Sequence, residues 1–101
     1  MNNLNSVLIE GTLTRNPMFN PSDINTTLHL ESTRTFKTPN DGEITEVSHF
    51  TVIAYGQQAE RCADYLSKGR EVRIIGRLKE TTDGILIVAD HVEIIPVAKS
   101  A

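Results

Sequence analysis

The sequence predicts an all-β fold, a five-stranded Greek-key barrel with one short α-helix between the third and fourth strands. Three segments alternate apolar and polar residues with a period of two, which is typical of half-buried strands, and residues 44–55 and 85–95 follow turn sequences as two further strands. A sixth segment, residues 57–66, instead places its apolar residues at helical spacing. A chain of 101 residues is long enough for one modest core and too short for two domains.

The first predicted strand covers residues 6–14, where Val7, Ile9 and Leu13 alternate with mostly polar neighbours. Residues 15–25 follow, with two prolines, three asparagines and no clean period, so we expect a connecting loop there. Phe19 would be tucked beneath this loop.

The next two strands form a long hairpin. Residues 26–36 alternate again and are rich in threonine, which favours strands, and residues 44–55 give the third strand. The Pro-Asn-Asp-Gly sequence between them is turn chemistry, so the two strands run antiparallel. Phe36 should therefore stand near the tip of the hairpin.

Residues 57–66 place Cys62 on one apolar helical stripe, which assigns this cysteine to the core. Lys68 and Gly69 end the helix, and residues 71–79 and 85–95 are the fourth and fifth strands. This order of elements is that of the OB-fold. We expect a single domain over residues 1–101, with its core at about 4–95 and a short flexible end at 96–101.

Charge and composition exclude several classes of protein. The net charge is −3, but residues 68–79 contain five basic residues and one glutamate, which leaves this window at +4 and the remainder at −7. No apolar run is long enough to span a bilayer, and the single cysteine cannot form an internal disulfide. We therefore expect a soluble cytoplasmic protein with no membrane partner.

Residues 51–78, TVIAYGQQAERCADYLSKGREVRIIGRL, closely resemble the central segment of bacterial single-stranded DNA-binding proteins, and LNSVLIEGTLTRNP resembles their first strand. The resemblance covers residues 4–95. It implies an OB-fold that binds single-stranded DNA independently of sequence in replication, recombination and repair, and a nucleoid-associated location in the cytoplasm. Such proteins stack bases on aromatic residues and contact phosphates with lysine and arginine.

Carried over residue by residue, the resemblance implies stacking on Phe36 and Tyr55, with His49 where relatives commonly have tryptophan. Arg34 and Lys37 flank Phe36 and would contact phosphates. The other expected contacts to single-stranded DNA are Arg15, Thr51, Arg73, Arg77 and Lys79.

Each of these assignments has a simpler alternative. Phe36 could cover its partner strand, Tyr55 could pack against the helix, and His49 could be an ordinary solvated strand residue. The basic face of residues 71–79 could be a subunit interface instead of a phosphate contact.

The sequence also departs from the family pattern. It has no tryptophan, a Thr-Thr-Asp-Gly turn replaces the usual long basic loop, and no acidic tail follows residue 95. We therefore expect a lower affinity per subunit and no tail-type recruitment of replication or repair proteins. An alternative function is that of a primosomal replication-type OB-fold adaptor, which bridges proteins on DNA.

No pattern in the sequence indicates an enzyme, a cofactor or a metal site. His91 and Glu93 alternate on one strand, and two ligands on one strand do not make a site.

Residues 85–95 are apolar on both strand faces, although a small barrel has only one inside. Leu8 adds an apolar residue to the outer face of the first strand. We expect a homo-oligomer, with a tetramer favoured over a dimer, to cover part of this surface. Extension of the last strand beyond the barrel is the competing explanation.

Overall fold

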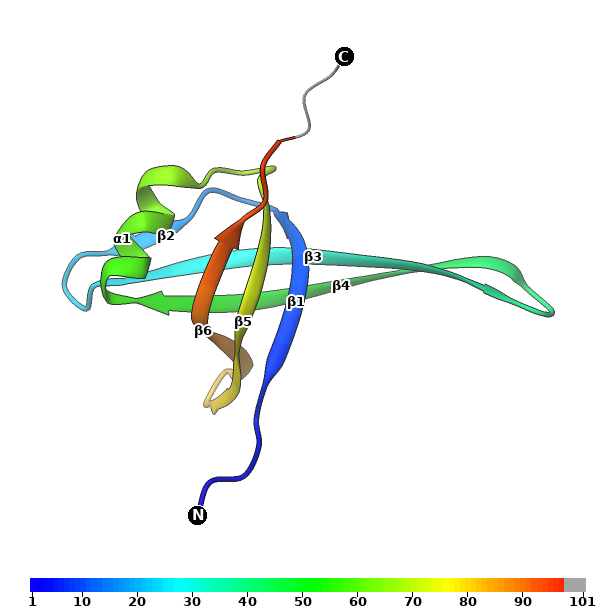
Figure 1. Cartoon of the computed structure of the whole chain (residues 1–101), viewed down its shortest axis with the longest axis horizontal. Coiled ribbons are helices and arrows are strands. Elements are labelled where there is room, and N and C mark those ends of the chain that lie inside the picture. The colour runs from blue at the N-terminus through cyan, green and yellow to red at the C-terminus, as the bar shows by residue number, and fades with distance from the viewer. Residues whose placement is uncertain (98–101) are drawn as a thin grey trace.

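The computed structural model describes residues 1–97 and contains six strands and one helix (Figure 1). In chain order they are β1 (Val7–Leu13), β2 (Met18–Asn20), β3 (Asn25–Thr38), β4 (Gly42–Tyr55), α1 (Gly56–Tyr65), β5 (Glu71–Thr81) and β6 (Gly84–Ile94). The sheet order is β1-β5-β6-β4-β3-β2, and an additional pairing of β1 with β3 closes the five long strands into a barrel. The predicted five-stranded barrel with one short helix is confirmed.

The strand pairings are antiparallel except between β4 and β6, which run parallel with Val52 opposite Ile87 and Ile53 opposite Val88. Leu28 and Leu30 on β3, Val52 on β4 and Ile74 on β5 are each no more than 1% exposed. Burial of these side chains inside the barrel is the main favourable term of folding.

Helix α1 covers one end of the barrel and is tied to it by side-chain hydrogen bonds. The buried Thr26 Oγ1 donates to the Ala59 carbonyl at 2.7 Å, and the Gln58 side chain bridges two backbone groups of β6, at Ala89 and Val92. Cys62 is buried as predicted, and burial raises the pKa of its thiol to about 11.

The expectation of a plain loop at residues 15–25 is wrong, because β2 lies there and pairs with β3, with Met18 opposite Thr27. Phe19 is not tucked beneath it but remains 41% exposed. A strand of three residues gives no detectable period, so the sequence pattern did not reveal it.

The β3–β4 hairpin is the feature that shapes the molecule. Its two strands pair over 14 residues each, from Asn25 opposite Tyr55 to Thr38 opposite Gly42. Leu30 is the last buried residue along β3, and Val52 is the first buried residue along β4. The distal part of the hairpin, between these two residues, therefore contains no fully buried residue. This part projects as an arm well beyond the barrel (Figure 1).

The two-sided apolar pattern of β6 is largely explained within one chain. A register shift at Ile75/Gly76 on β5 leaves Asp90 as an extra residue on β6, and both Val88 and Ala89 are buried in the same chain. Beyond the shift, Leu78 on β5 is 46% exposed, although it has the same strand parity as the buried Val72 and Ile74. The expected end at residues 96–101 lies mostly outside the described residues.

Gly76 is required where β5 crosses the bulge. A Cβ at this position would collide with the Val88 carbonyl oxygen of β6. We expect Gly76→Ala to destabilise the fold by about 3 kcal/mol, because the added methyl group can be accommodated only by moving backbone. Thermal melting followed by circular dichroism would measure the effect.

Gly42→Ala is the matched control, since Gly42 has φ +70 and open space around the new methyl group. Its cost should be only that of a left-handed alanine, about 1 kcal/mol. Equal melting temperatures for the two variants would contradict the close-approach explanation.

Candidate nucleic-acid interface

Strands β2, β3 and β4 present one exposed face, set by alternation along paired strands. Tyr55 lies opposite Asn25, which lies opposite Asn20, and Ile53, Thr27 and Met18 form the next row. Further along, β3 and β4 continue the face with two more rows. We call this surface the outer face, and its residues are Met18, Asn20, Asn25, Thr27, His29, Glu31, His49, Thr51, Ile53 and Tyr55.

Tyr55 ends β4 and is the N-cap residue of α1. Gly56 follows with φ 65 and donates its backbone N–H to the Ile24 carbonyl at 2.9 Å, which turns the chain sharply into the helix. Tyr55 remains 47% exposed at this corner, so packing against the helix does not bury its side chain. A partly exposed ring on a strand end is available for stacking.

A shallow pocket of about 190 Å³ brings three predicted contact residues together with a fourth residue that was not predicted. Arg15, His49 and Thr51 line it beside His29. At the rim of the pocket, the backbone N–H of Thr14, the residue after β1, donates to the His29 carbonyl at 2.9 Å.

The electrostatics of this pocket are mixed. Burial, and then the nearby Arg15 guanidinium, lower the pKa of His29 below its ordinary value. The His49 Nε2 lies 3.3 Å from a Glu31 carboxylate oxygen. Arg15 is therefore the permanent cation of the pocket.

His29 was not among the predicted contacts, because strand parity was followed along residues 49–55 and not across the hairpin to its partner strand. The alternation of Leu28 and Leu30 would have placed His29 on the same face as Thr51, given the hairpin register. Met18 and Asn20 gave no signal, since β2 itself was not predicted.

The hairpin register separates the predicted contacts at the arm into two groups. Phe36 lies opposite Ile44 and Arg34 opposite Glu46, on the parity of the buried core residues. Lys37, opposite Glu43, has the parity of the outer face. Phe36 is half-buried, which agrees with a cross-strand contact to Ile44. The two groups can meet one ligand only if it follows the twist of the arm.

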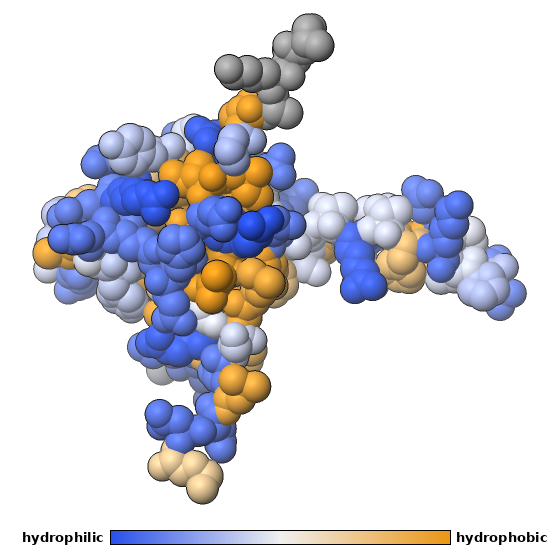
Figure 2. Space-filling view, viewed as in Figure 1, coloured by the Kyte–Doolittle hydropathy of each residue, from blue (hydrophilic) through white to orange (hydrophobic). Residues whose placement is uncertain are grey.

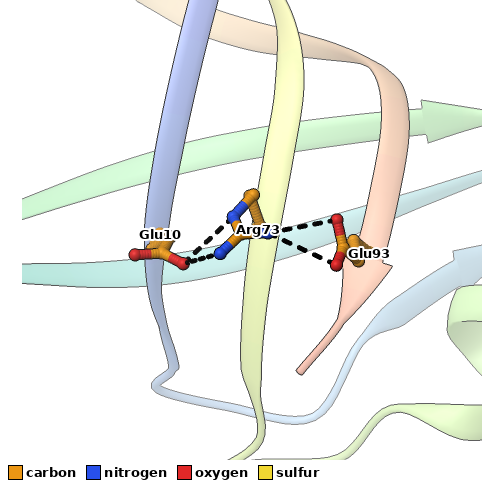
Figure 3. Close-up of polar contacts among 3 residues, drawn as sticks. All are labelled: Glu10, Arg73 and Glu93. Atoms are coloured by element: carbon orange, nitrogen blue, oxygen red, sulfur yellow. Dashed lines mark hydrogen bonds and ion pairs between the residues drawn. The ribbon is translucent and has the colours of Figure 1, made fainter. Parts of the chain in front are cut away.

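Two of the three predicted cations of β5, Arg73 and Arg77, are already paired with carboxylates. Arg73 lies between Glu10 of β1 and Glu93 of β6, with N···O distances of 2.6 and 3.3 Å (Figure 3). These contacts raise the pKa of Arg73, the hydrogen bond to Glu10 most of all. Arg77 pairs with Asp90 at 3.2 Å. In the described part of the chain, Lys79 takes part in no such pair.

Within residues 1–97, no helix is long and apolar enough to cross a membrane. The same residues contain no group of three or more histidine, cysteine, aspartate or glutamate side chains that could hold a metal ion.

The Arg15 charge next to His29 gives a direct test of the pocket geometry. Arg15→Gln should raise the pKa of His29 toward its ordinary value, without restoring it fully, because burial is the larger cause of the shift. NMR titration of the imidazole resonances measures this. Arg73→Gln is the control and should leave the His29 titration unchanged. An unchanged titration in Arg15→Gln would contradict the proximity of the Arg15 charge to His29.

The fold and its outer face can be compared with known proteins. The chain is 31% identical over 86 residues to single-stranded DNA-binding protein 2 of Chlorobaculum tepidum, covering 81% of this chain and 58% of that protein. It is 35% identical over 103 aligned positions to the single-stranded DNA-binding protein of Clostridium tetani, covering 89% of this chain and 69% of that one. The chain therefore spans somewhat more than half of the length of these relatives.

Solved structures agree in fold. A deletion mutant of the Thermus aquaticus single-stranded DNA binding protein superposes with a TM-score of 0.77 at 26% identity, over 92% of this chain and 51% of that one. The Plasmodium falciparum protein in complex with single-stranded DNA gives 0.79 at 18% identity, over 95% and 98% of the two chains. The small single-stranded DNA-binding protein of Streptomyces coelicolor gives 0.76 at 24% identity, over 94% and 96%.

The model of one protein family matches residues 4–83, which is most of the chain and includes β1 to β5. Together with the two relatives, this match shows that the chain belongs to the single-strand binding protein family.

Proposed function

We propose that this protein binds single-stranded DNA independently of sequence, in DNA replication, recombination and repair, by laying the strand across the outer face. The observation that supports this most is the alignment of an exposed aromatic, Tyr55, with Thr51 and His49 along β4, and with Arg15 at the margin. Every base has a π-face, so an exposed ring binds any sequence. The named function of the relatives supports the same proposal.

The arm extends this contact surface. Arg34, Phe36 and Lys37 lie near its tip, and the right-handed twist of a long hairpin turns its two faces progressively around the axis. A single strand is flexible enough to follow that twist, so it would meet Lys37 and then Phe36. The described chain places neither Arg34 nor Lys37 in an ion pair, which leaves both charges for phosphates.

Arg73 and Arg77 can contribute to phosphate binding only by exchanging their carboxylate partners. Such an exchange gains little net energy, because an existing charge pair must be broken. We therefore assign the phosphate contacts chiefly to Arg15, Arg34, Lys37 and Lys79.

Competition between single-stranded and duplex DNA tests the proposed function. Labelled oligo(dT) should bind much more tightly than a duplex of the same length, because only unpaired bases expose both faces for stacking. Its affinity should fall with salt as cations displace condensed counterions. Fluorescence anisotropy at two salt concentrations measures both quantities. Equal affinity for the duplex, or binding to neither, would favour the adaptor function instead.

Substitutions in the arm separate stacking from charge. Phe36→Ala should weaken oligo(dT) binding by the loss of one stack, about 1–3 kcal/mol or roughly five- to a hundred-fold, with little change in salt dependence. Arg34→Ala and Lys37→Ala should instead each reduce the slope of log affinity against log salt by about 0.7. The measurement is a salt series of oligo(dT) titrations.

Thermal melting provides the control for this series. Phe36 is half-buried against β4, so its removal should lower the melting temperature only slightly. A large fall in melting temperature with normal binding would show that Phe36 is a packing residue.

We also propose that the protein is a homo-oligomer, with a tetramer favoured over a dimer. Its outward surface over β1, β5 and β6 is apolar, and charged side chains cross it (Figure 2). Leu8 is 70% exposed there and lies opposite the exposed Ile75. One edge of β1 pairs with β5, while the other pairs with β3 only at Thr12 and Leu13. An exposed apolar face beside a partly unpaired strand edge suits association with a second copy.

Multi-angle light scattering at micromolar concentration should give a multiple of the 11.2 kDa chain mass. The paired substitution Leu8→Glu with Ile75→Glu should shift this value toward one chain, because it places four charges on a two-fold contact. A wild-type protein of one chain mass would remove the oligomer proposal.

A further inference from the structure

A second pocket lies at the opposite end of α1 from Tyr55. Its volume is about 360 Å³, and Arg61 and Tyr65 of α1, Arg70 before β5, and Ile94 at the end of β6 line it. Arg61 and Tyr65 are four residues apart and therefore share one side of the helix. The pocket thus combines two guanidinium groups with an aromatic ring and an aliphatic side chain.

The two arginines in this pocket are not neutralised by carboxylates. None of the ion pairs in residues 1–97 involves Arg61 or Arg70, although Glu60 and Asp64 stand on the same helix. Arg61 makes one long hydrogen bond, from Nη1 to the Val92 carbonyl at 3.3 Å. The Nε of Arg70 is buried and has no hydrogen-bond partner in the described chain. Each guanidinium therefore retains unused donor capacity.

The ring of Tyr65 is unusually exposed for an aromatic side chain. It is 66% exposed, and its hydroxyl has no hydrogen-bond partner among the described residues. The stripe of α1 that packs into the barrel contains Ala59 and Cys62, so Tyr65 is not needed to hold the helix in place. Exposed tyrosine beside arginine is a combination that suits a base and its phosphate.

We propose that this pocket binds one nucleotide unit of single-stranded DNA, with the base stacked on Tyr65 and the phosphate held by Arg61 and Arg70. The inference rests on the proposed function and adds to it a contact site outside the outer face and the arm. Helix α1 has ten residues, so its two ends are about 15 Å apart. A strand that leaves Tyr55 along the helix would reach Tyr65 after this distance.

The two tyrosines provide a direct readout, because the chain contains no tryptophan and only these two tyrosines. In Tyr55→Phe, the remaining tyrosine emission comes from Tyr65 alone, and the phenylalanine still allows stacking at position 55. Oligo(dT) should quench this emission at the same protein-to-DNA ratio at which anisotropy of a labelled oligo(dT) shows binding. Tyr65→Phe reports the Tyr55 site in the same way.

Arg70→Gln tests the charge contribution of the pocket. It should weaken binding of long oligo(dT) about three- to tenfold and reduce the salt slope by about 0.7, the value for one lost phosphate contact on a single strand. Binding of oligo(dT) too short to reach both ends of α1 should be unchanged. Lys68→Gln removes a nearby positive charge that does not line the pocket, and it should have a clearly smaller effect.

The outcomes distinguish this inference from the proposed function. If labelled oligo(dT) binds while Tyr65 emission stays constant, the second site is wrong and the proposed function stands. If Phe36→Ala and Arg15→Gln weaken binding but Arg70→Gln behaves as Lys68→Gln, the second site is again wrong. If neither the wild-type protein nor any variant binds oligo(dT), both proposals fail. Quenching of Tyr65 by polyglutamate but not by oligo(dT) would reassign the pocket to acidic peptides and overturn the proposal.

Discussion

The unbroken register of the β3–β4 hairpin is the constraint on which the rest of the structure depends. Because its 14 residue pairs contain no bulge, the positions of Leu28 and Val52 in the core fix the outward direction of His29 and Thr51. A slip of one residue would bury the polar side chains and expose the core. The core and the candidate DNA face are therefore two sides of one pairing.

The positively charged residues of the chain fall into two groups, those that pair with carboxylates and those that do not. On the side formed by β1, β5 and β6, arginines satisfy carboxylates, as Arg73 does between Glu10 and Glu93. Elsewhere, at the margin of the outer face, on the arm and at the far end of α1, cations have no carboxylate partner in the described chain. This distribution explains how a chain of net charge −3 can present local positive surface to a polyanion.

The sequence predicted every long strand, the helix and the barrel class, because each element has either a periodic apolar pattern or turn chemistry at its ends. Family membership also confirms the prediction that the chain is not an enzyme. Other features depend on contacts between distant segments. The partners of Arg73, the bulge beside Gly76, the strand β2 and the place of His29 beside Arg15 follow from tertiary register, which no local pattern encodes. The roles of the predicted contact residues remain predictions.

The most direct test of the central claim is to map oligo(dT) on the protein by amide chemical-shift changes in a ¹H–¹⁵N NMR titration. The largest changes should follow the outer face, from Tyr55 through Thr51 and His49 to the arm. The amides around Glu10, Arg73 and Glu93 should change little. Changes concentrated around that ion-pair network, with the outer face unaffected, would show that the outer face is not the DNA-binding surface.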